Sequence, residues 1–314
     1  MPNSESKYIL QLIDLDEEIS INLNKDFNDI ASEDYYRSSM VILGQEGAVF
    51  SQGYTIEISG TIPVNAGVSS SSALVVAWLR FLIEAQEAQW NVSDAQIGEW
   101  AYRSEVQFFK QPGGLMDQYT IAQGGMIYID TQKGEVTPLS TNLGTLILAE
   151  SGLAKKTLSV LQNARDFAQR AIEEVKIQYS EFDLHKAQEV DYNNYESFVS
   201  NPYKPYWYAS IHNHLITQKA KKQLLQLEPD LIQLGSLMNA HQKILQECIQ
   251  NTPEPMINQM NAALQAGALG AKIIGSGGGG AMVAIAEEHT KENIIQAFKT
   301  AGAHDAYEVK LAIH

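Results

Sequence analysis

Cysteine is almost absent from this sequence of 314 residues, in which Cys248 is the only one. A single cysteine cannot form an intramolecular disulfide, so the composition fits a reducing compartment. Basic residues are also scarce, because 22 Lys and Arg stand against 37 Asp and Glu, a formal net charge of −15. Affinity for nucleic acid depends on clustered Lys and Arg, and this balance therefore argues against a nucleic-acid partner.

Apolar runs of membrane-spanning length are absent as well. The first residues, Met-Pro-Asn-Ser-Glu-Ser, lack the basic and apolar regions of a signal peptide. We therefore expect a soluble, cytoplasmic protein without a membrane partner. The length is sufficient for a large core and favours two lobes over one.

A Ser-rich loop stands out in the first half of the chain. It runs from Pro63 through Gly67 and Val68 to Ser69, Ser70, Ser71 and Ser72. An alternating segment at 54–59 predicts a strand before it, and an apolar run at 74–83 predicts a helix after it. The free N–H groups at the start of such a helix favour phosphate, although the loop is not a P-loop. From these residues alone, an ordinary loop before a capped helix is the simpler interpretation.

A second dense stretch is Gln111-Pro-Gly-Gly-Leu-Met-Asp117. It joins a predicted helix at 93–105, with Ser93 as its N-cap, to a predicted strand that ends at Asp130. The proline and the two glycines indicate a tight turn that presents the Asp117 carboxylate at a fixed place. A helix-capping role for Asp117 is the alternative.

A third stretch contains five glycines and one serine at 275–280, between apolar segments at 267–274 and 281–285. The apolar segments predict two short strands. A flexible linker is the alternative interpretation of the glycines, but linkers rarely stand between two apolar strands.

Other segments predict scaffold rather than chemistry. Alternation predicts a hairpin at 8–15 and 18–23, and an apolar run predicts a buried strand at 144–150. Asp34 lies near the start of a further predicted helix. Longer helices are predicted by the patterns at 156–177, 211–226 and 231–249, with a Tyr-rich insertion at 179–208 that we expect to pack between helices. His212, His214 and His241 show no metal-ligand spacing, and we assign no metal to them.

In combination, the three dense stretches resemble the GHMP kinases, which include galactokinase, homoserine kinase, mevalonate kinase and phosphomevalonate kinase. The second motif of that family has Pro, three residues, Gly, a hydrophobic residue, a Ser-rich run and Ala, as at 63–73. Galactokinases have Gly-Gly-hydrophobic-Met-Asp-Gln where this chain has 113–118, and the third family motif is similar to 270–280. The resemblance covers residues from about 40 to 300.

The resemblance implies a two-lobed α+β fold, with an N-terminal lobe at 1–140 that resembles a ribosomal protein of the small subunit. A ferredoxin-like C-terminal lobe would cover 141–314, with the site between the lobes. It also implies phosphoryl transfer from ATP, with Mg²⁺, to a hydroxyl of a small molecule, with a sugar as the expected substrate. The resemblance implies that the phosphates are bound by Pro63, Gly67, Val68 and Ser69 to Ser72, and the metal by Ser71 and Glu105. It implies Asp117 as the catalytic residue. The implied substrate-binding residues are Gly114, Asp117, Gly277 and Gly278.

The spacing of the two carboxylates favours the galactokinase branch. Glu105 lies twelve residues before Asp117, as the metal-binding Glu does in galactokinases. Mevalonate kinases place that Glu eleven residues before the Asp, where this chain has Val106.

Two features depart from the galactokinase pattern. The first family motif, Pro-Gly-Arg-Val-Asn-Leu-Ile-Gly-Glu-His, is absent, so we expect a chain that is shortened at its N-terminus or has lost the first strand and its basic residue. Leu161 stands where galactokinases have a Tyr that packs on the sugar, which makes galactose itself uncertain as the substrate. The alternatives are a mevalonate-type kinase and a non-catalytic, galactokinase-like sensor of sugar and nucleotide.

Overall fold

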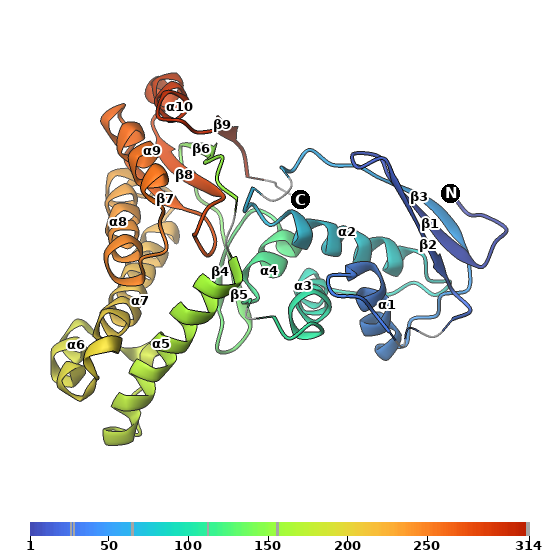
Figure 1. Cartoon of the computed structure of the whole chain (residues 1–314), viewed down its shortest axis with the longest axis horizontal. Coiled ribbons are helices and arrows are strands. Elements are labelled where there is room, and N and C mark those ends of the chain that lie inside the picture. The colour runs from blue at the N-terminus through green and yellow to red at the C-terminus, as the bar shows by residue number, and fades with distance from the viewer. Residues whose placement is uncertain (26, 28, 64–65, 112, 155–156, 312–314) are drawn as a thin grey trace. The chain divides into compact units, whose positions relative to one another are not determined.

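The computed structural model (Figure 1) describes residues 1–25, 27, 29–63, 66–111, 113–154 and 157–311, except for the side chains of 157–162. Two compact units account for the chain. The first comprises Met1–Pro63 and Ser69–Thr137, and the second comprises Val64–Val68 and Pro138–Ala312. The short segment Val64–Val68 thus belongs to the second unit although the residues on both sides of it belong to the first.

The first unit contains a sheet of three strands, in the order β2-β1-β3. The predicted hairpin is confirmed, because β1 (Lys7–Leu12) and β2 (Glu17–Asn22) pair antiparallel. Strand β3 (Tyr54–Ile58) joins β1 in parallel after helix α1. The other elements of the unit are α1 (Tyr35–Gln45), α2 (Ser70–Glu84), α3 (Asp94–Tyr102), the π-helical turn η1 (Arg103–Gln107), α4 (Met116–Gln123) and the two-stranded sheet of β4 (Met126–Asp130) and β5 (Glu135–Leu139).

Local sequence explains where these helices begin. The Asp34 carboxylate accepts a hydrogen bond from the N–H of Arg37, and the Ser93 hydroxyl accepts one from the N–H of Gln96. Both side chains satisfy an N–H group that has no partner within its helix, so the predicted N-cap at Ser93 and the predicted helix start at Asp34 are confirmed.

Helix α2 supplies the centre of the core of the first unit. Its buried side chains recur at helical spacing, at Val75, Trp78, Leu79 and Leu82, and pack against the sheet and α1. The Trp78 ring meets the ring of Tyr8 edge to face, at 5.6 Å between centroids. A rigid, buried α2 fixes the position of the Ser-rich turn at its N-terminus.

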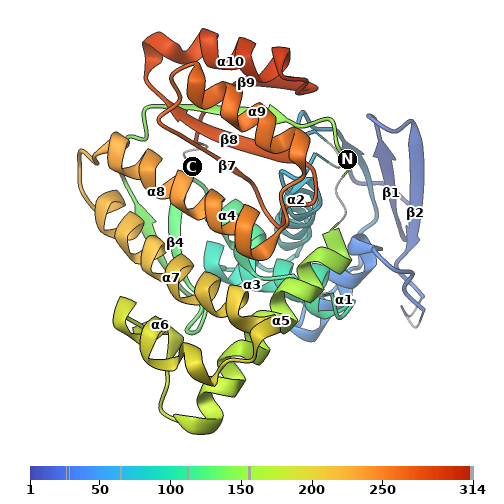
Figure 2. The same cartoon turned by 60° about the vertical axis from the view of Figure 1, so that its left-hand side comes forward.

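The second unit contains an antiparallel sheet of four strands, in the order β7-β8-β6-β9. The strands are β6 (Thr145–Glu150), β7 (Gly270–Ile273), β8 (Ala281–Ala286) and β9 (Asp305–Val309). Helices α9 (Glu254–Gln265) and α10 (Lys291–Thr300) cover one face of this sheet through a shared apolar core (Figure 2). The two strands predicted around the glycine loop are therefore confirmed as the antiparallel pair β7 and β8.

Helices α5 (Thr157–Gln178), α6 (Glu189–Tyr195) and α7 (Lys204–Leu224) of the second unit contribute to a separate apolar cluster. The unit also contains α8 (Leu231–Ile244), the π-helical turn η5 (Leu245–Ile249) and short 3₁₀ turns at Leu184–Lys186, Glu196–Phe198, Asn201–Tyr203 and Glu288–Thr290. Within the Tyr-rich insertion, Trp207 is fully buried beside Phe182. These aromatic side chains pack between helices, as the sequence predicts.

Helix α8 closes the open edge of β7. A methyl group added at Gly235 would lie 2.3 Å from the backbone oxygen of Leu269, so only glycine lets the helix approach this closely. Two side-chain amides then pair with the edge strand: Asn239 accepts from the N–H of Ala271, and Gln242 accepts from the N–H of Ile273. Edge strands invite pairing with other chains, and these amides occupy the groups that would pair.

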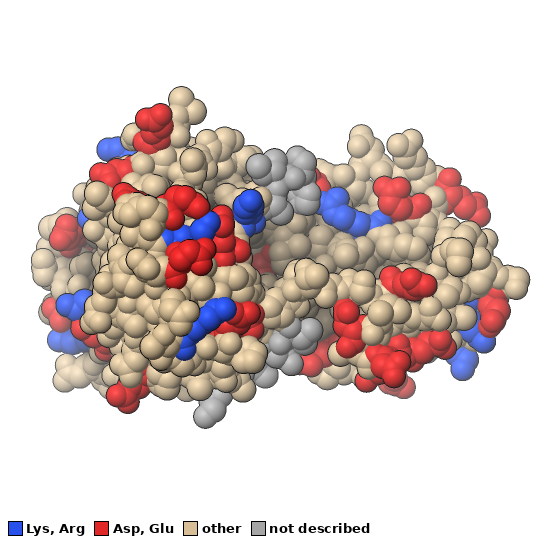
Figure 3. Space-filling view, turned by 90° about the horizontal axis from the view of Figure 1, so that it is seen from above, with Lys and Arg blue, Asp and Glu red and all other residues tan. Residues whose placement is uncertain are grey.

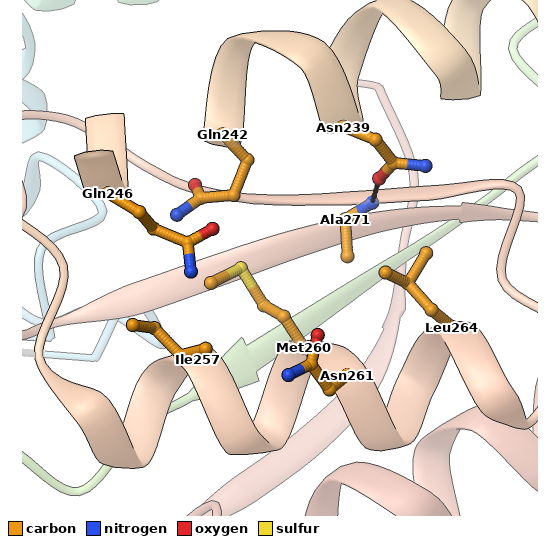
Figure 4. Close-up of a pocket in the computed structure, with 8 residues that line it drawn as sticks. All are labelled: Asn239, Gln242, Gln246, Ile257, Met260, Asn261, Leu264 and Ala271. Carbon is orange, nitrogen blue, oxygen red and sulfur yellow. Dashed lines mark hydrogen bonds between the residues drawn. The ribbon is translucent and has the colours of Figure 1, made fainter. Parts of the chain in front are cut away.

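A small cavity of about 60 Å³ lies beside these amides (Figure 4). Side chains from α8, η5 and α9 line it together with Ala271. Its amide-bearing members are Asn239, Gln242, Gln246 and Asn261. The space suffices for one or two water molecules rather than a metabolite.

Acidic and basic side chains are interspersed on the face of the molecule shown in Figure 3, where no extended basic surface is visible among the described residues. None of the helices in the described part of the chain is both long and apolar enough to cross a membrane.

Candidate active site

The Ser-rich turn leads into α2 without a side-chain cap. Ser69 is the N-cap residue, in the left-handed conformation at φ 60°, and its hydroxyl makes no capping hydrogen bond. A left-handed serine is strained, and such strain is typical of functional sites. The first N–H groups of α2 therefore lack the usual partner from the cap, and an anion would satisfy them.

Three buried polar side chains meet behind this turn, each from a different helix. Ser72 lies on α2, Glu105 on the π-helical turn η1, and Gln118 on α4. Glu105 is only 6% exposed. Its Oε2 accepts hydrogen bonds from Ser72 Oγ at 2.7 Å and from Gln118 Nε2 at 2.7 Å, and Gln118 Nε2 lies 3.2 Å from Ser72 Oγ. We refer to these three residues as the Glu105 cluster.

The Glu105 cluster fits a divalent cation. Among the described residues, Glu105 has no Lys, Arg or His partner, and the two groups that donate to it are neutral. A buried carboxylate is costly unless it is paired or coordinates a metal. The Oε1 atom of Gln118 is buried without a hydrogen-bond partner. Carboxylate, hydroxyl and amide oxygens are the ligands that Mg²⁺ prefers.

Tyr35 of α1 belongs to the surroundings of this cluster. Burial is the main cause that raises the pKa of its hydroxyl; a side-chain hydrogen bond with Gln111 opposes the rise, and the nearby Glu105 charge adds to it. The cluster therefore has a neutral phenol nearby rather than a counter-charge.

Asp117 lies in the first turn of α4, directly before Gln118. The N-cap of this helix is Leu115, so the helix-capping role considered for Asp117 does not apply. Asp117 is half-buried, and it makes no hydrogen bond or ion pair with the part of the chain that the structure describes. A carboxylate in the first turn of a helix is stabilised by the macrodipole. Gly114, which precedes it, is exposed, and a methyl group there would meet nothing.

The glycine loop lies in the second unit, where the turn after η5 holds it. The Asn251 backbone oxygen accepts a hydrogen bond from the N–H of Gly278 at 2.7 Å, and Asn251 Nδ2 donates to the Ser276 oxygen at 2.9 Å. Gly277 has φ +79°, and a methyl group on it would lie 2.4 Å from the Asn251 oxygen. The N–H of Gly278 and the carbonyl of Ser276 are thus both engaged within the protein, which holds the loop in place.

The glycine loop also meets the beginning of the Ser-rich stretch. A methyl group on Gly280 would lie 3.1 Å from the oxygen of Ala66 and 3.3 Å from the Cα of Gly67, and all three residues belong to the second unit. Gly67 itself has φ 78°. The first and third dense segments of the sequence, more than two hundred residues apart, are therefore in contact.

Lys272 of β7 is a half-buried amine just before the glycine loop. Its Nζ donates to the backbone oxygen of Ile273 at 2.7 Å, and burial lowers its pKa to about 8. Burial and, secondarily, the Lys272 charge lower the pKa of His241 to about 4.

Two models of known protein families match this chain. The model described as "GHMP kinases N terminal domain" matches residues 35–125, and the model described as "GHMP kinases C terminal" matches residues 220–304. The chain belongs to the GHMP kinases. The first match contains the Ser-rich stretch, Glu105 and Asp117, and the second contains the glycine loop.

Curated relatives of this GHMP kinase include two kinds of enzyme. A galactokinase from Limosilactobacillus reuteri is 25% identical over 273 residues, which span 82% of this chain and 67% of that protein. A mevalonate kinase from Thermococcus gammatolerans is 26% identical over 262 residues, again 82% of this chain and 67% of the relative.

Solved structures share the fold of this GHMP kinase. The galactokinase of Lactococcus lactis in complex with galactose matches 100% of this chain and 84% of its own, with a TM-score of 0.82 at 18% identity. The mevalonate kinase of Methanococcus jannaschii matches 100% of this chain and 87% of its own, with a TM-score of 0.66 at 16% identity. The expected two-lobed α+β GHMP kinase fold is confirmed.

The structure brings together some of the predicted site residues and adds others. Within the first unit, Glu105 meets Ser72, while Ser71 makes no hydrogen bond with it. The metal roles of Ser71 and Glu105, the phosphate roles of Pro63 to Ser72 and the substrate roles of Gly114, Gly277 and Gly278 remain predictions. Sequence reasoning missed Gln118 and Asn251. The Met-Asp-Gln run contained the signal for Gln118, but nothing local marks Asn251. The side chain of Leu161 lies outside the described residues.

Proposed function

We propose that this chain is an ATP-dependent kinase that transfers the γ-phosphoryl group to a hydroxyl of a sugar, as galactokinases do. One observation carries the proposal: the buried Glu105 carboxylate is hydrogen-bonded to the residue that follows Asp117. The proposed cation ligand Glu105 is thereby held by Gln118, which lies next to the half-buried carboxylate of Asp117 on α4. Phosphoryl transfer needs both, since it depends on charge neutralisation and on the position of the attacking hydroxyl.

Each motif has a role in this proposal. The uncapped N-terminus of α2, with Gly67 and Ser69 to Ser72, binds the nucleotide phosphates through backbone N–H groups. Glu105, with Ser71 or Ser72, holds Mg²⁺, which would neutralise charge on the phosphates. Asp117 accepts the proton of the acceptor hydroxyl or orients its oxygen. Gly114 and the loop at Gly277 and Gly278 contribute to binding of the substrate.

The lobes in this proposal are residues 1–140 and 141–314. Support comes from the two compact units, which divide the chain near Thr137. We further propose a cytoplasmic location, for which the acidic composition and the metabolic enzymes among the relatives are the grounds.

A mevalonate-type kinase is the second candidate, and the Thermococcus gammatolerans relative favours it. The spacing of Glu105 and Asp117 favours the galactokinase branch instead. A non-catalytic sensor of sugar and nucleotide is a third candidate, because the Glu105 cluster and the uncapped α2 would serve binding without turnover.

A coupled assay of ADP release separates these candidates. The chain is incubated with MgATP and, in separate reactions, with galactose, other hexoses and mevalonate. Sugar-dependent ADP release is the expected result. Release with mevalonate alone would support the second candidate, and nucleotide binding without release in any reaction would support the sensor.

A further inference from the structure

Gln118 belongs to the Met-Asp-Gln run, and packing alone does not explain why its amide is buried. Its side chain lies on α4 and is 3% exposed. The nitrogen of its amide faces the Glu105 cluster, at 2.7 Å from Glu105 Oε2 and 3.2 Å from Ser72 Oγ. Its Oε1 atom is buried and has no hydrogen-bond partner. An amide oxygen left without a donor in the interior is costly, unless a ligand supplies that donor.

The amide controls which oxygen of Glu105 can bind a ligand. Oε2 accepts from both Ser72 and Gln118, so its lone pairs are occupied. Among the described residues, no hydrogen bond reaches Oε1 of Glu105. Carboxylates that bind metals are usually oriented by such hydrogen bonds, which decide the direction of the free oxygen.

We propose that Gln118 is the positioning residue of the cation site: its amide N–H₂ fixes Glu105, and its Oε1 accepts a hydrogen bond from a water molecule bound to the cation. This inference rests on the proposed function, since it takes the Glu105 cluster as the Mg²⁺ site. Mg²⁺ retains several of its water molecules in proteins, and each can donate to an oxygen such as Oε1. The unpartnered amide oxygen thereby acquires its donor only when the cation is bound.

The test measures cation affinity rather than turnover. Mn²⁺ serves as the probe, and electron paramagnetic resonance measures the concentration of free Mn²⁺ with and without ADP. All measurements are made well below the melting temperature of each variant. Gln118→Met keeps an unbranched side chain of similar length but removes both hydrogen bonds. Its Mn²⁺ affinity is expected to fall at least about tenfold, in the range measured for groups that orient metal ligands.

Gln259→Met is the matched control. Gln259 lies on α9, is 1% exposed, donates to the Ser151 oxygen at 3.3 Å, and also has a buried Oε1 without a partner. Both substitutions remove a buried amide, so both lower the melting temperature. Only Gln118→Met should weaken Mn²⁺ binding. Gln118→Asn shortens the side chain by one methylene, so its amide cannot reach Glu105, and this variant should also weaken Mn²⁺ binding. It replaces the methionine variant if that variant does not fold.

The possible outcomes separate the two proposals. If the wild type binds Mn²⁺ and both Gln118 variants bind it equally tightly, the role of Gln118 is wrong while the kinase proposal stands. If the wild type binds no Mn²⁺ even with ADP, the cation site is wrong, and the role of Gln118 is wrong with it. An equal loss of affinity in the Gln259 variant would mean that any buried amide has this effect, which also overturns the inference.

Discussion

Replacing Lys272 with methionine should stabilise this protein at neutral pH. Lys272 is half-buried on β7, and its Nζ donates a hydrogen bond to the Ile273 oxygen. Among the described residues it forms no ion pair, and its titratable neighbour His241, whose pKa is lowered to about 4, is neutral at pH 7 and supplies no counter-charge. A buried ammonium without a carboxylate opposes folding.

The pKa of Lys272 gives the size of this effect. Burial lowers it from 10.5 to about 8. At about 1.4 kcal/mol per pKa unit, the charged form costs at most about 3.5 kcal/mol. The lost hydrogen bond to Ile273 offsets about 1 kcal/mol of the gain. We expect the free energy of unfolding of Lys272→Met to exceed that of the wild type by about 1–2 kcal/mol at pH 7.

The pH dependence has a definite sign. Between pH 8 and 10.5 the unfolded chain keeps the Lys272 proton while the folded chain loses it. The wild type therefore gains stability relative to the variant as the pH rises through this window, and the advantage of the variant is complete only below pH 8. At pH 10 most of the difference should be gone.

Urea unfolding at pH 7 and pH 10 measures both quantities. Lys243→Met is the control, because the Lys243 side chain is 71% exposed and lies 3.9 Å from Glu247. Exposed pairs of this kind contribute about 0–1 kcal/mol, so this variant should change little at either pH. The reasoning fails if Lys272→Met is less stable than the wild type at pH 7, or if its advantage is the same at both pH values.

Three further predictions concern the candidate site. Asp117→Asn should lower turnover by about 10²–10⁴-fold in the ADP-release assay, with an unchanged melting temperature, because it removes the proposed base and Asp117 caps no helix. Gly67→Val should abolish the rise in melting temperature that we expect MgADP to produce in the wild type, since Gly67 has φ 78° at the proposed phosphate turn; a shift that persists would contradict the phosphate role. Gly277→Ala should destabilise more than Gly134→Ala in urea unfolding: both glycines have positive φ, at a cost of about 1–2 kcal/mol for alanine, but only at Gly277 does the methyl group clash, at 2.4 Å from Asn251. Equal losses would show that the Asn251 contact is not rigid.

The starts of α1 and α3 were predictable because their signals are local, whereas α9 and α10 were not predicted. Asp34 and Ser93 act as N-caps through a hydrogen bond three residues along the chain. The strands around the glycine loop were predictable for a similar reason, since short apolar runs next to glycines favour strands. The second sheet was only partly predictable: β9 carries no strong alternation, and it becomes a strand because it pairs with β6.

The geometry of the Glu105 cluster was not predictable from spacing. The pattern at 93–105 predicts one regular helix, but the structure changes from α-helix to a π-helical turn at Arg103. A π-helical turn inserts an extra residue and so rotates the side chains that follow, and such turns are frequent at functional sites. Glu105, which contacts Ser72 and Gln118, lies within this turn, and no local residue preference signals it.

The kinase and the sensor differ in what they require of Asp117. Both need phosphate and cation groups, so the Glu105 cluster and the uncapped α2 do not separate them. Asp117 does, because it has no structural role in the described part of the chain. Leu115 is the N-cap of α4, and no hydrogen bond or ion pair from the described residues engages the Asp117 carboxylate. Its presence one residue from Gln118 therefore favours turnover over sensing, and the Asp117→Asn assay measures that difference directly.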